Sequence, residues 1–154
     1  MAELSPEGSG PDIAERLMDS KTPSAPDMEG KDLPSDVLIV EDDPLIGLDV
    51  SDILRDLGVL SVRTAVSVAS AMQAIAERAP AFALLDVKLG RDDSFAVADE
   101  LAGLAIPFAF VTGYRDASMF PARFIQRPTV AKPYSREALE ALLARWRNGA
   151  ASPD

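Results

Sequence analysis

Hydrophobic residues along the chain fall into two kinds of segment. Short runs, most of them continuous, show little alternation with polar residues, which is typical of strands covered on both faces of a sheet. Longer segments between them repeat their apolar positions every three or four residues, the period of a helix with one buried face. The runs predict strands at 37–40, 60–66, 81–86, 107–112 and 129–132.

The helix-like segments carry recognisable end signals. Pro44 suits a first helical turn, and Gly58 follows the last apolar position of that helix. Ser67 is a suitable N-cap for a second helix. Pro121 interrupts the segment 113–126, where we expect only a short or irregular helix. Regular helices are predicted at 44–57, 68–79, 94–103 and 135–147, and the inner face of the second at Val68, Met72, Ile75 and Ala79.

This alternation of strands and helices predicts a doubly wound α/β fold. Parallel neighbours need a crossover, so five strand–helix repeats give a five-stranded parallel sheet with helices on both faces. Ligands of such sheets bind outside the carboxyl ends of the strands. Polar side chains stand where four of the predicted strands end, and we therefore expect them to meet at that edge. These residues are Glu41, Asp42, Asp43, Asp86, Thr112 and Lys132.

Composition divides the chain into three parts. Residues 1–34 hold five of the twelve prolines and more acids than bases. Such a segment buries too little apolar surface to offset the entropy of ordering. We expect a disordered extension over 1–34, one folded domain over 35–148 and a short tail over 149–154. An alternative for the extension is a short helix over 12–20 that docks on a partner.

The absence of two residue types narrows the chemistry. The chain contains no cysteine and no histidine, which excludes disulfides, zinc sites built from those residues and a Ser-His-Asp triad. A net charge of −10 argues against a nucleic-acid-binding surface, which needs clustered Lys and Arg. No apolar run approaches the ~20 residues of a membrane span, and no signal segment precedes the first strand. We expect a cytoplasmic protein that binds neither nucleic acid nor membrane.

The polar side chains at the sheet edge suit phosphoryl chemistry. Several carboxylates in one shallow site repel one another unless a cation joins them, and oxygen ligands with room for water suit Mg²⁺. Asp86 ends the central strand, where its carboxylate can act as a nucleophile toward phosphorus. Thr112 can donate its hydroxyl to a phosphoryl oxygen, and Lys132 can neutralise another. The set predicts a magnesium-dependent phosphoryl-accepting site.

Each of these residues also has a structural explanation. Asp86 can be a turn or helix-capping residue, and the acids before Pro44 can favour a helix N-terminus through its dipole. Thr112 can be a turn residue, and Lys132 can be a solvated charge or part of a salt bridge. Four strands that end in complementary chemical groups favour the functional interpretation over these separate explanations.

Four segments resemble the receiver domain of two-component response regulators: VLIVEDDPLI at 37–46, ALLDVKLG at 83–90, PFAFVTGY at 107–114 and AKP at 131–133. The resemblance implies the flavodoxin-like strand order 2-1-3-4-5. It implies that Asp86 is the phosphoacceptor and that Thr112 and Lys132 are the hydroxyl and lysine of the family's site. It further implies Mg²⁺ ligands, which are Glu41, Asp42, Asp86 and the backbone carbonyl of Lys88, with Asp43 as a candidate third acid.

The segment PFAFVTGY is similar to the PFxFATGY signature of a subgroup of single-domain alphaproteobacterial receivers, with Val111 in place of alanine. Three positions depart from the common family pattern. The segment 88–90 is Lys-Leu-Gly where the family has Met-Pro, which predicts a different path for the loop after Asp86. Gly113 replaces a small Ala or Ser. Thr129 replaces the aromatic switch residue, so the family's usual coupling cannot pass through that position.

These departures lead to two hypotheses about signalling. We expect the switch to lie in the segment 113–126, with Tyr114 as a candidate mobile aromatic. Lys88 is the second unusual feature, because an ammonium near the phosphoryl group would alter its rate of hydrolysis. A solvated surface charge is the alternative for Lys88.

The resemblance implies a stand-alone receiver that takes a phosphoryl group from a sensor histidine kinase. It would signal, relay or drain phosphate through a phosphotransfer or downstream regulatory protein, as a monomer or weak dimer. Its catalysis would be limited to its own phosphorylation and dephosphorylation. Two alternatives stay open: a receiver-like binding module that works without phosphorylation, and a magnesium-dependent phosphatase with an Asp nucleophile. The phosphatase usually has a second Asp two residues on, where Lys88 stands here.

Overall fold

The computed structural model describes residues 33–113, 120–132 and 134–147. Residues 1–32 of the predicted extension over 1–34, the aromatic Tyr114 and the tail from residue 148 lie outside these residues. The predictions about those three parts therefore stay predictions. Leu33 and Pro34, the last two residues of that extension, are described and buried, and Leu33 packs in the hydrophobic core. Among the described helices, none is both long and apolar enough to cross a membrane.

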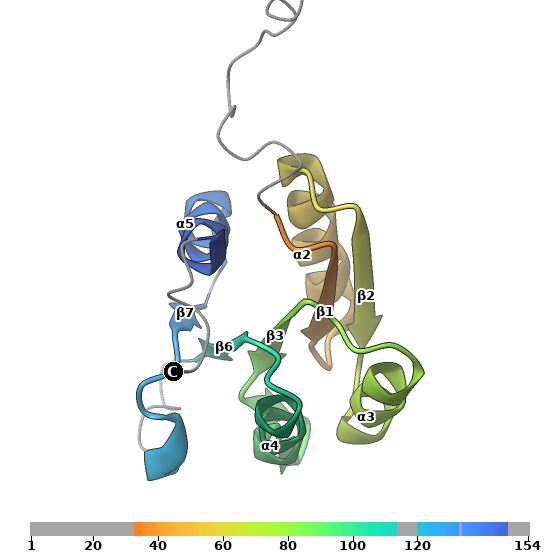
Figure 1. Ribbon diagram of the computed structural model, residues 1–154, viewed down its shortest axis with the longest axis vertical. Helices are drawn as coiled ribbons and strands as arrows, with labels where there is room; N and C mark the ends of the chain where they lie inside the picture. The colour runs from red at the N-terminus through yellow and green to blue at the C-terminus, as the bar shows by residue number, and fades with distance from the viewer. Residues whose placement is uncertain (1–32, 114–119, 133, 148–154) are drawn as a thin grey trace, which may run out of the picture.

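Five strands form one parallel sheet in the order β2-β1-β3-β6-β7, as Figure 1 shows. Two further strands, β4 (Lys88–Leu89) and β5 (Asp92–Asp93), pair with each other in a separate antiparallel hairpin. When the sheet strands alone are numbered, their order is the predicted 2-1-3-4-5, and the predicted fold class is confirmed. The sheet strands are β1 (Asp36–Val40), β2 (Ser61–Ala65), β3 (Phe82–Asp86), β6 (Phe108–Thr112) and β7 (Thr129–Ala131).

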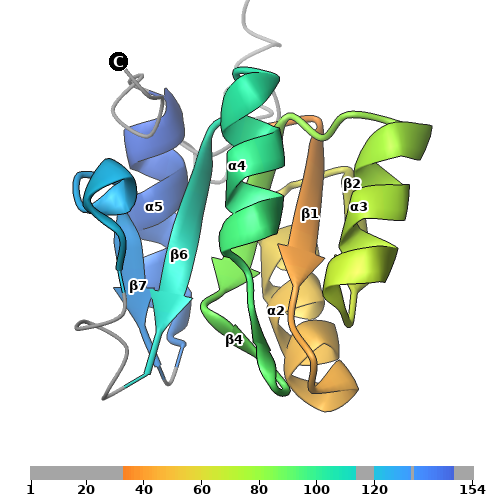
Figure 2. The same cartoon turned by 90° about the horizontal axis from the view of Figure 1, so that it is seen from below.

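Helices cover both faces of the sheet (Figures 1 and 2). On one face lie α2 (Pro44–Leu57) and α5 (Arg136–Arg147). On the other lie α3 (Val68–Glu77) and α4 (Phe95–Gly103), followed by the short 3-10 helix η4 (Ala122–Phe124). The prediction of a short or irregular helix near Pro121 is confirmed by η4, which Pro121 directly precedes.

Two hydrophobic clusters fill the space between the sheet and the helices. On β1, Val37 and Ile39 face the α2 and α5 side, while Leu38 and Val40 face the α3 and α4 side, and all four are fully buried. Both faces of the central strands are therefore apolar. This explains why the strands appear in the sequence as continuous hydrophobic runs.

Five phenylalanines form a single cluster on the α4 side of the sheet. Their ring centroids lie 4.9 to 6.0 Å apart, mostly in edge-to-face contact. Edge-to-face pairs are favourable beyond the area they bury. The cluster joins α4, β6 and η4 and anchors η4 despite its single turn. Its members are Phe95, Phe108, Phe110, Phe120 and Phe124.

The helix ends follow the predicted signals in most places. Gly58 has a φ of 116° and donates its backbone N–H to carbonyls of the last turn of α2, a conformation that favours glycine. Ser67 caps α3 in a reciprocal capping box with Ser70. One prediction is wrong: α3 ends at Glu77, so Ala79 is exposed beyond the helix. Ala71, one turn before Ile75, is the buried residue in its place.

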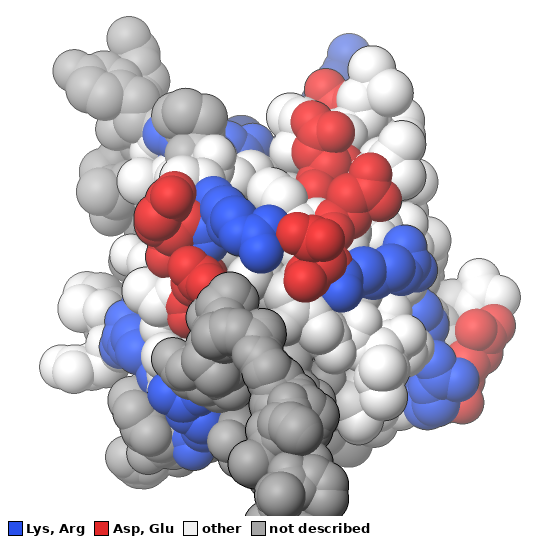
Figure 3. Space-filling model, turned by 90° about the horizontal axis from the view of Figure 1, so that it is seen from above, with Lys and Arg blue, Asp and Glu red and all other residues white. Residues whose placement is uncertain are grey.

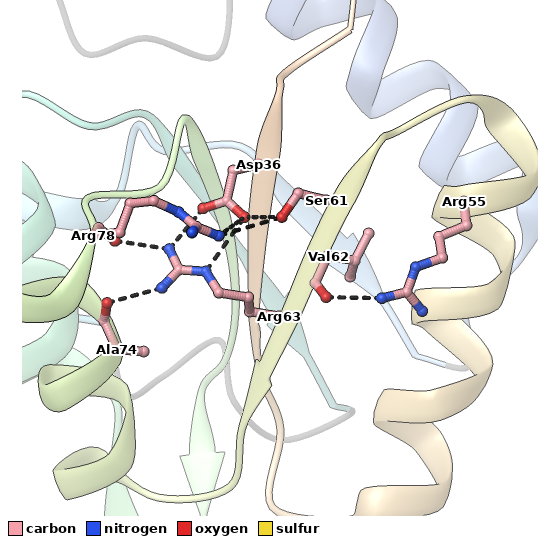
Figure 4. A network of polar contacts seen from close by, with 7 residues as sticks. All are labelled: Asp36, Arg55, Ser61, Val62, Arg63, Ala74 and Arg78. Atoms are coloured by element: carbon pink, nitrogen blue, oxygen red, sulfur yellow. Dashed lines mark hydrogen bonds and ion pairs between the residues drawn. The ribbon is translucent and has the colours of Figure 1, made fainter.

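A buried acid ties together the amino-terminal edge of the sheet (Figure 4). Asp36 Oδ2 lies 2.6 Å from Arg63 Nη2, and Asp36 Oδ1 accepts from Ser61 Oγ at 2.7 Å and from Arg78 Nη2 at 3.4 Å. Arg63 also donates to the Ala74 carbonyl at 2.9 Å. Burial alone would raise the pKa of Asp36, but the hydrogen bonds from Arg63, Ser61 and Arg78 outweigh it and lower that pKa.

This network generates a stability prediction. Asp36→Asn leaves Arg63 without its charged partner, and we expect the free energy of unfolding at pH 7 to fall by about 2 kcal/mol, because Arg63 is only partly buried. A carboxyl whose pKa is lowered in the folded state stabilises above its unfolded pKa and stops doing so as pH falls through the folded value. The difference in the free energy of unfolding between wild type and Asp36→Asn should therefore become smaller below about pH 4.

Urea denaturation at pH 7 and at pH 3 measures both quantities. Asp99→Asn is the matched control, since Asp99 also pairs with an arginine, Arg123, but both side chains are about half exposed. A destabilisation by Asp36→Asn no larger than that of Asp99→Asn would contradict the structural role of the network.

Candidate functional site

The parallel strands of the sheet end at the same edge (Figure 2). The predicted polar residues lie at the carboxyl ends of four of them. Glu41 directly follows β1, Asp86 ends β3, Thr112 ends β6 and Lys132 directly follows β7. The register holds these strand ends level, because Leu85 pairs with both Val40 and Phe110.

Three carboxylates converge at this edge. One oxygen each from Glu41, Asp42 and Asp86 lies within 4.8 Å of the others. Glu41 and Asp86 are buried, with exposed fractions of 2% and 3%, while Asp42 is exposed. Asp43, the candidate third acid, is not among these three carboxylates. It is the N-cap of α2, and its Oδ1 accepts from the backbone N–H of Leu45 at 2.9 Å.

Among the residues that the structure describes, Lys132 supplies the positive charge in contact with the carboxylates. Its Nζ donates to Asp86 Oδ2 at 2.9 Å and lies 3.8 Å from Glu41 Oε1. Its backbone N–H donates to the Thr112 carbonyl at 2.9 Å, which fixes the start of the side chain against β6. The structure thus brings the predicted lysine and the predicted acceptor into direct contact.

The electrostatics of the cluster are unbalanced. Burial raises the pKa of Glu41 to about 7, an effect to which the charge of Asp86 adds and which the Asp43 backbone N–H opposes. Burial also raises the pKa of Asp86, against the hydrogen bond from Lys132. Burial lowers the pKa of Lys132, but its contacts with Asp86 and Glu41 outweigh this and raise it, so the ammonium stays charged. One ammonium does not neutralise three carboxylates, and a cation would complete the balance.

The donor set fits a divalent ion of the Mg²⁺ type. Within the described residues, Glu41 Oε1 is buried and has no hydrogen-bond partner, so its lone pairs are available to a ligand. All three side chains offer oxygen, and the exposure of Asp42 leaves room for the water that Mg²⁺ retains. Glu41, Asp42 and Asp86 are therefore the residues that would hold the ion.

The segment after Asp86 forms a hairpin where the sequence predicts a loop with an altered path. Lys88 pairs with Asp93, and Leu89 pairs with Asp92 on either side of a two-residue turn. In such hairpins the pair next to the turn exchanges hydrogen bonds, which leaves the backbone groups of the following pair, here Lys88 and Asp93, directed outward. That register is compatible with the Lys88 carbonyl as a metal ligand, which stays a prediction.

Thr112 lines a second feature of the same edge. With Gly113, Phe120, Ile125 and Thr129 it surrounds a pocket of about 240 Å³. Phe120 is thus an aromatic residue beside Thr112 that the sequence analysis did not identify. The available sequence signal was the presence of four phenylalanines within the segment that follows Pro107.

A groove of about 640 Å³ adjoins the site on the α2 side. Its lining includes Ile46, Ile53 and Tyr134, together with Lys132 of the site itself. Burial, together with the charges of Glu41 and Asp86, raises the pKa of Tyr134. Figure 3, which views the side of α2 and α5, shows acidic side chains gathered on this face with Lys and Arg between them. The sequence analysis missed Tyr134 because it lies beyond the motif that ends at position 133.

The chain is similar to known proteins in both sequence and structure. The family model for the response regulator receiver domain matches residues 37–144. The phyllosphere-induced regulator PhyR of Methylorubrum extorquens is 29% identical over 74% of this chain, which spans only 44% of that protein's length. The solution structure of SdrG from Sphingomonas melonis Fr1 is 37% identical, with a TM-score of 0.65 over 74% of this chain and 96% of SdrG. The receiver domain of PhyR from Erythrobacter litoralis is 26% identical, with a TM-score of 0.66 over 78% of this chain and 95% of its own.

Asp42 belongs to the carboxylate cluster and Asp43 caps α2, and this difference predicts how each affects metal binding. Asp42→Asn should weaken Mg²⁺ binding at least about tenfold, because it removes a carboxylate from the cluster. Asp43→Asn makes the same chemical change one residue along, preserves the helix cap and should leave the affinity nearly unchanged. Isothermal titration calorimetry with Mg²⁺ measures both. Equal losses from the two variants would contradict the assignment of Asp42.

The raised pKa of Glu41 predicts how stability depends on pH. Between pH 4.5 and about 7 the folded protein keeps a proton on Glu41 that the unfolded chain has lost, so stability should fall as pH rises through this window. The chain has no histidine to mask the effect. Without Mg²⁺, we expect a loss of up to about 3 kcal/mol between pH 5 and pH 8.

Urea denaturation at a series of pH values measures this dependence. Glu41→Gln should make it clearly shallower, because the glutamine side chain cannot titrate, while Asp86, whose pKa is also raised by burial, still contributes. A Glu41→Gln variant with the same slope as wild type would show that the pH dependence arises elsewhere.

Proposed function

The chain belongs to the response regulator receiver domain family, and from this premise we propose that it accepts a phosphoryl group on Asp86 from a histidine kinase in a Mg²⁺-dependent reaction. The single observation that carries the proposal is the contact of Lys132 Nζ with Asp86 Oδ2 at 2.9 Å, at the sheet edge where Glu41 and Asp42 also converge. A buried carboxylate beside an ammonium and further acids suits a group that will carry a phosphoryl unit.

The proposed transfer is a displacement at phosphorus. An Asp86 carboxylate oxygen attacks the phosphorus of the kinase phosphohistidine, a P–O bond forms, and the P–N bond breaks with its electron pair leaving on the imidazole nitrogen. In this proposal Lys132 neutralises one phosphoryl oxygen, and the Thr112 hydroxyl donates to another. Mg²⁺ held by Glu41, Asp42, Asp86 and the Lys88 carbonyl would supply further positive charge.

The phosphorylated state ends when water attacks the phosphorus and releases inorganic phosphate, which regenerates the Asp86 carboxylate. The chain's own catalysis is then limited to its phosphorylation and dephosphorylation. Its output passes through contact with another protein, as a direct signal, as a step in a relay or as a drain on a shared kinase. PhyR of Methylorubrum extorquens is named a regulator, and this chain spans 44% of its length.

Substitution of the acceptor tests the proposal. Asp86→Asn should reduce phosphoryl incorporation by more than about 100-fold, because an amide cannot form the acyl phosphate. The test uses radiolabelled phosphoramidate, whose P–N bond resembles that of phosphohistidine, together with phosphorylated histidine kinases. Asp92→Asn, which neutralises an exposed acid in the nearby hairpin, is the control and should behave as wild type.

The outcomes separate the proposed function from its alternative. Incorporation that survives Asp86→Asn would refute the acceptor. A wild-type protein that takes no label from either donor in the presence of Mg²⁺ would favour a receiver-like binding module that works without phosphorylation.

A further inference from the structure

The β4–β5 hairpin reaches across the sheet edge to one of the metal-binding acids. The backbone N–H of Gly90 donates to Asp42 Oδ2 at 2.9 Å, although the two residues are 48 positions apart in the sequence. Gly90 is the first residue of the turn and has a φ of 66°, where a side chain would be strained. The turn conformation directs this N–H toward Asp42 and away from the hairpin's own ladder.

Asp42 is the acid of the cluster that most needs to be oriented. Glu41 and Asp86 are held in place by burial, whereas the Asp42 side chain is exposed, and burial does not select one rotamer for it. A carboxylate has two oxygens and about four lone-pair positions, so one hydrogen bond from Gly90 leaves ample capacity for a metal ion. The bond can therefore fix the carboxylate without blocking it.

The hairpin is held firmly enough to orient another group. Leu89 is buried in the core on the α4 side, with an exposed fraction of 5%. At the other end, the backbone N–H of Ser94 donates to the Val87 carbonyl at 3.0 Å, and Asp93 Oδ1 accepts from the Phe95 N–H at 3.0 Å. The hairpin is thus anchored by Leu89 in the core and by Asp93 at the start of α4, and the hydrogen bond from Ser94 to Val87 closes its base.

We propose that the Gly90 N–H is a positioning group that holds the Asp42 carboxylate in its metal-binding orientation, which makes the hairpin a working part of the site. The inference rests on the proposed Mg²⁺-dependent function. Partners that hydrogen-bond to a ligating carboxylate raise metal affinity by fixing its orientation, and their loss typically weakens binding by about 10- to 100-fold. The hydrogen bond itself is charge-assisted and therefore stronger than one between neutral groups.

An amide-to-ester replacement at Gly90 removes this N–H without adding a side chain. Glycolic acid in place of Gly90, introduced during translation, replaces the N–H with an oxygen and keeps the hydrogen side chain that the φ of 66° favours. The control is the same type of replacement at Arg91, one residue further along the turn. We expect Mg²⁺ affinity, measured by isothermal titration calorimetry, to fall about tenfold for the ester at 90 and less than about twofold for the ester at 91.

Unmodified protein provides a second measurement. In the Mg²⁺-loaded state, NMR should detect a scalar coupling between the Gly90 amide nitrogen and the Asp42 carboxylate carbon, which only a persistent hydrogen bond transmits. Absence of this coupling in the loaded protein would overturn the proposal. So would an ester at 90 that binds Mg²⁺ as tightly as wild type or more tightly, because the N–H would then be neutral or would compete with the ion.

Failure of this inference is distinguishable from failure of the proposed function. If wild type binds Mg²⁺ and the ester at 90 binds it about tenfold more weakly, the positioning role stands even if Asp86 takes no phosphoryl group. If wild type is phosphorylated on Asp86 while the ester at 90 keeps full Mg²⁺ affinity, the function stands and the positioning role falls. If wild type binds no Mg²⁺, both fall.

Discussion

The burial of two carboxylates beside a single ammonium is the constraint on which the chemistry of this protein depends. Glu41 and Asp86 are almost fully enclosed, and Lys132 contacts Asp86 directly and approaches Glu41. Burial raises the pKa of both carboxyls because it disfavours their charged forms. A metal ion at this edge would offset that cost, and the proposed phosphorylation depends on it.

Buried acids at the two edges of the sheet have opposite surroundings and opposite pKa shifts. At the amino-terminal edge, Asp36 is surrounded by Arg63, Ser61 and Arg78, and its pKa is lowered. At the carboxyl edge, Glu41 keeps an oxygen without a hydrogen-bond partner among the described residues. The first arrangement stabilises the fold, while the second leaves binding capacity unused and lowers stability. Acids with a pKa raised in this way are candidates for a functional site.

The sheet and most of the site follow from local sequence signals. Parallel strands end at one edge, so Asp86 and Lys132 can be placed together from the strand ends alone. Gly58 marks a helix end because glycine readily adopts a positive φ. The hairpin at 88–93 is not predictable in this way, because its strands have two residues each and its contact with Asp42 depends on tertiary structure. Residues that pack around a site have no local sequence motif, and the position of Phe120 beside Thr112 was therefore not predicted. Ala79 was wrongly assigned to the buried face because the spacing of apolar residues continues to position 79, whereas α3 ends at Glu77.

Chemical identification of the phosphorylated residue is the sharpest test of Asp86 as the acceptor. After incubation with phosphoramidate, borohydride reduction converts an aspartyl phosphate to homoserine, and peptide sequencing locates it. We predict homoserine at position 86, formed only when Mg²⁺ is present during phosphorylation. Homoserine at another acid, or its formation at 86 without Mg²⁺, would contradict the proposed chemistry of this sheet edge.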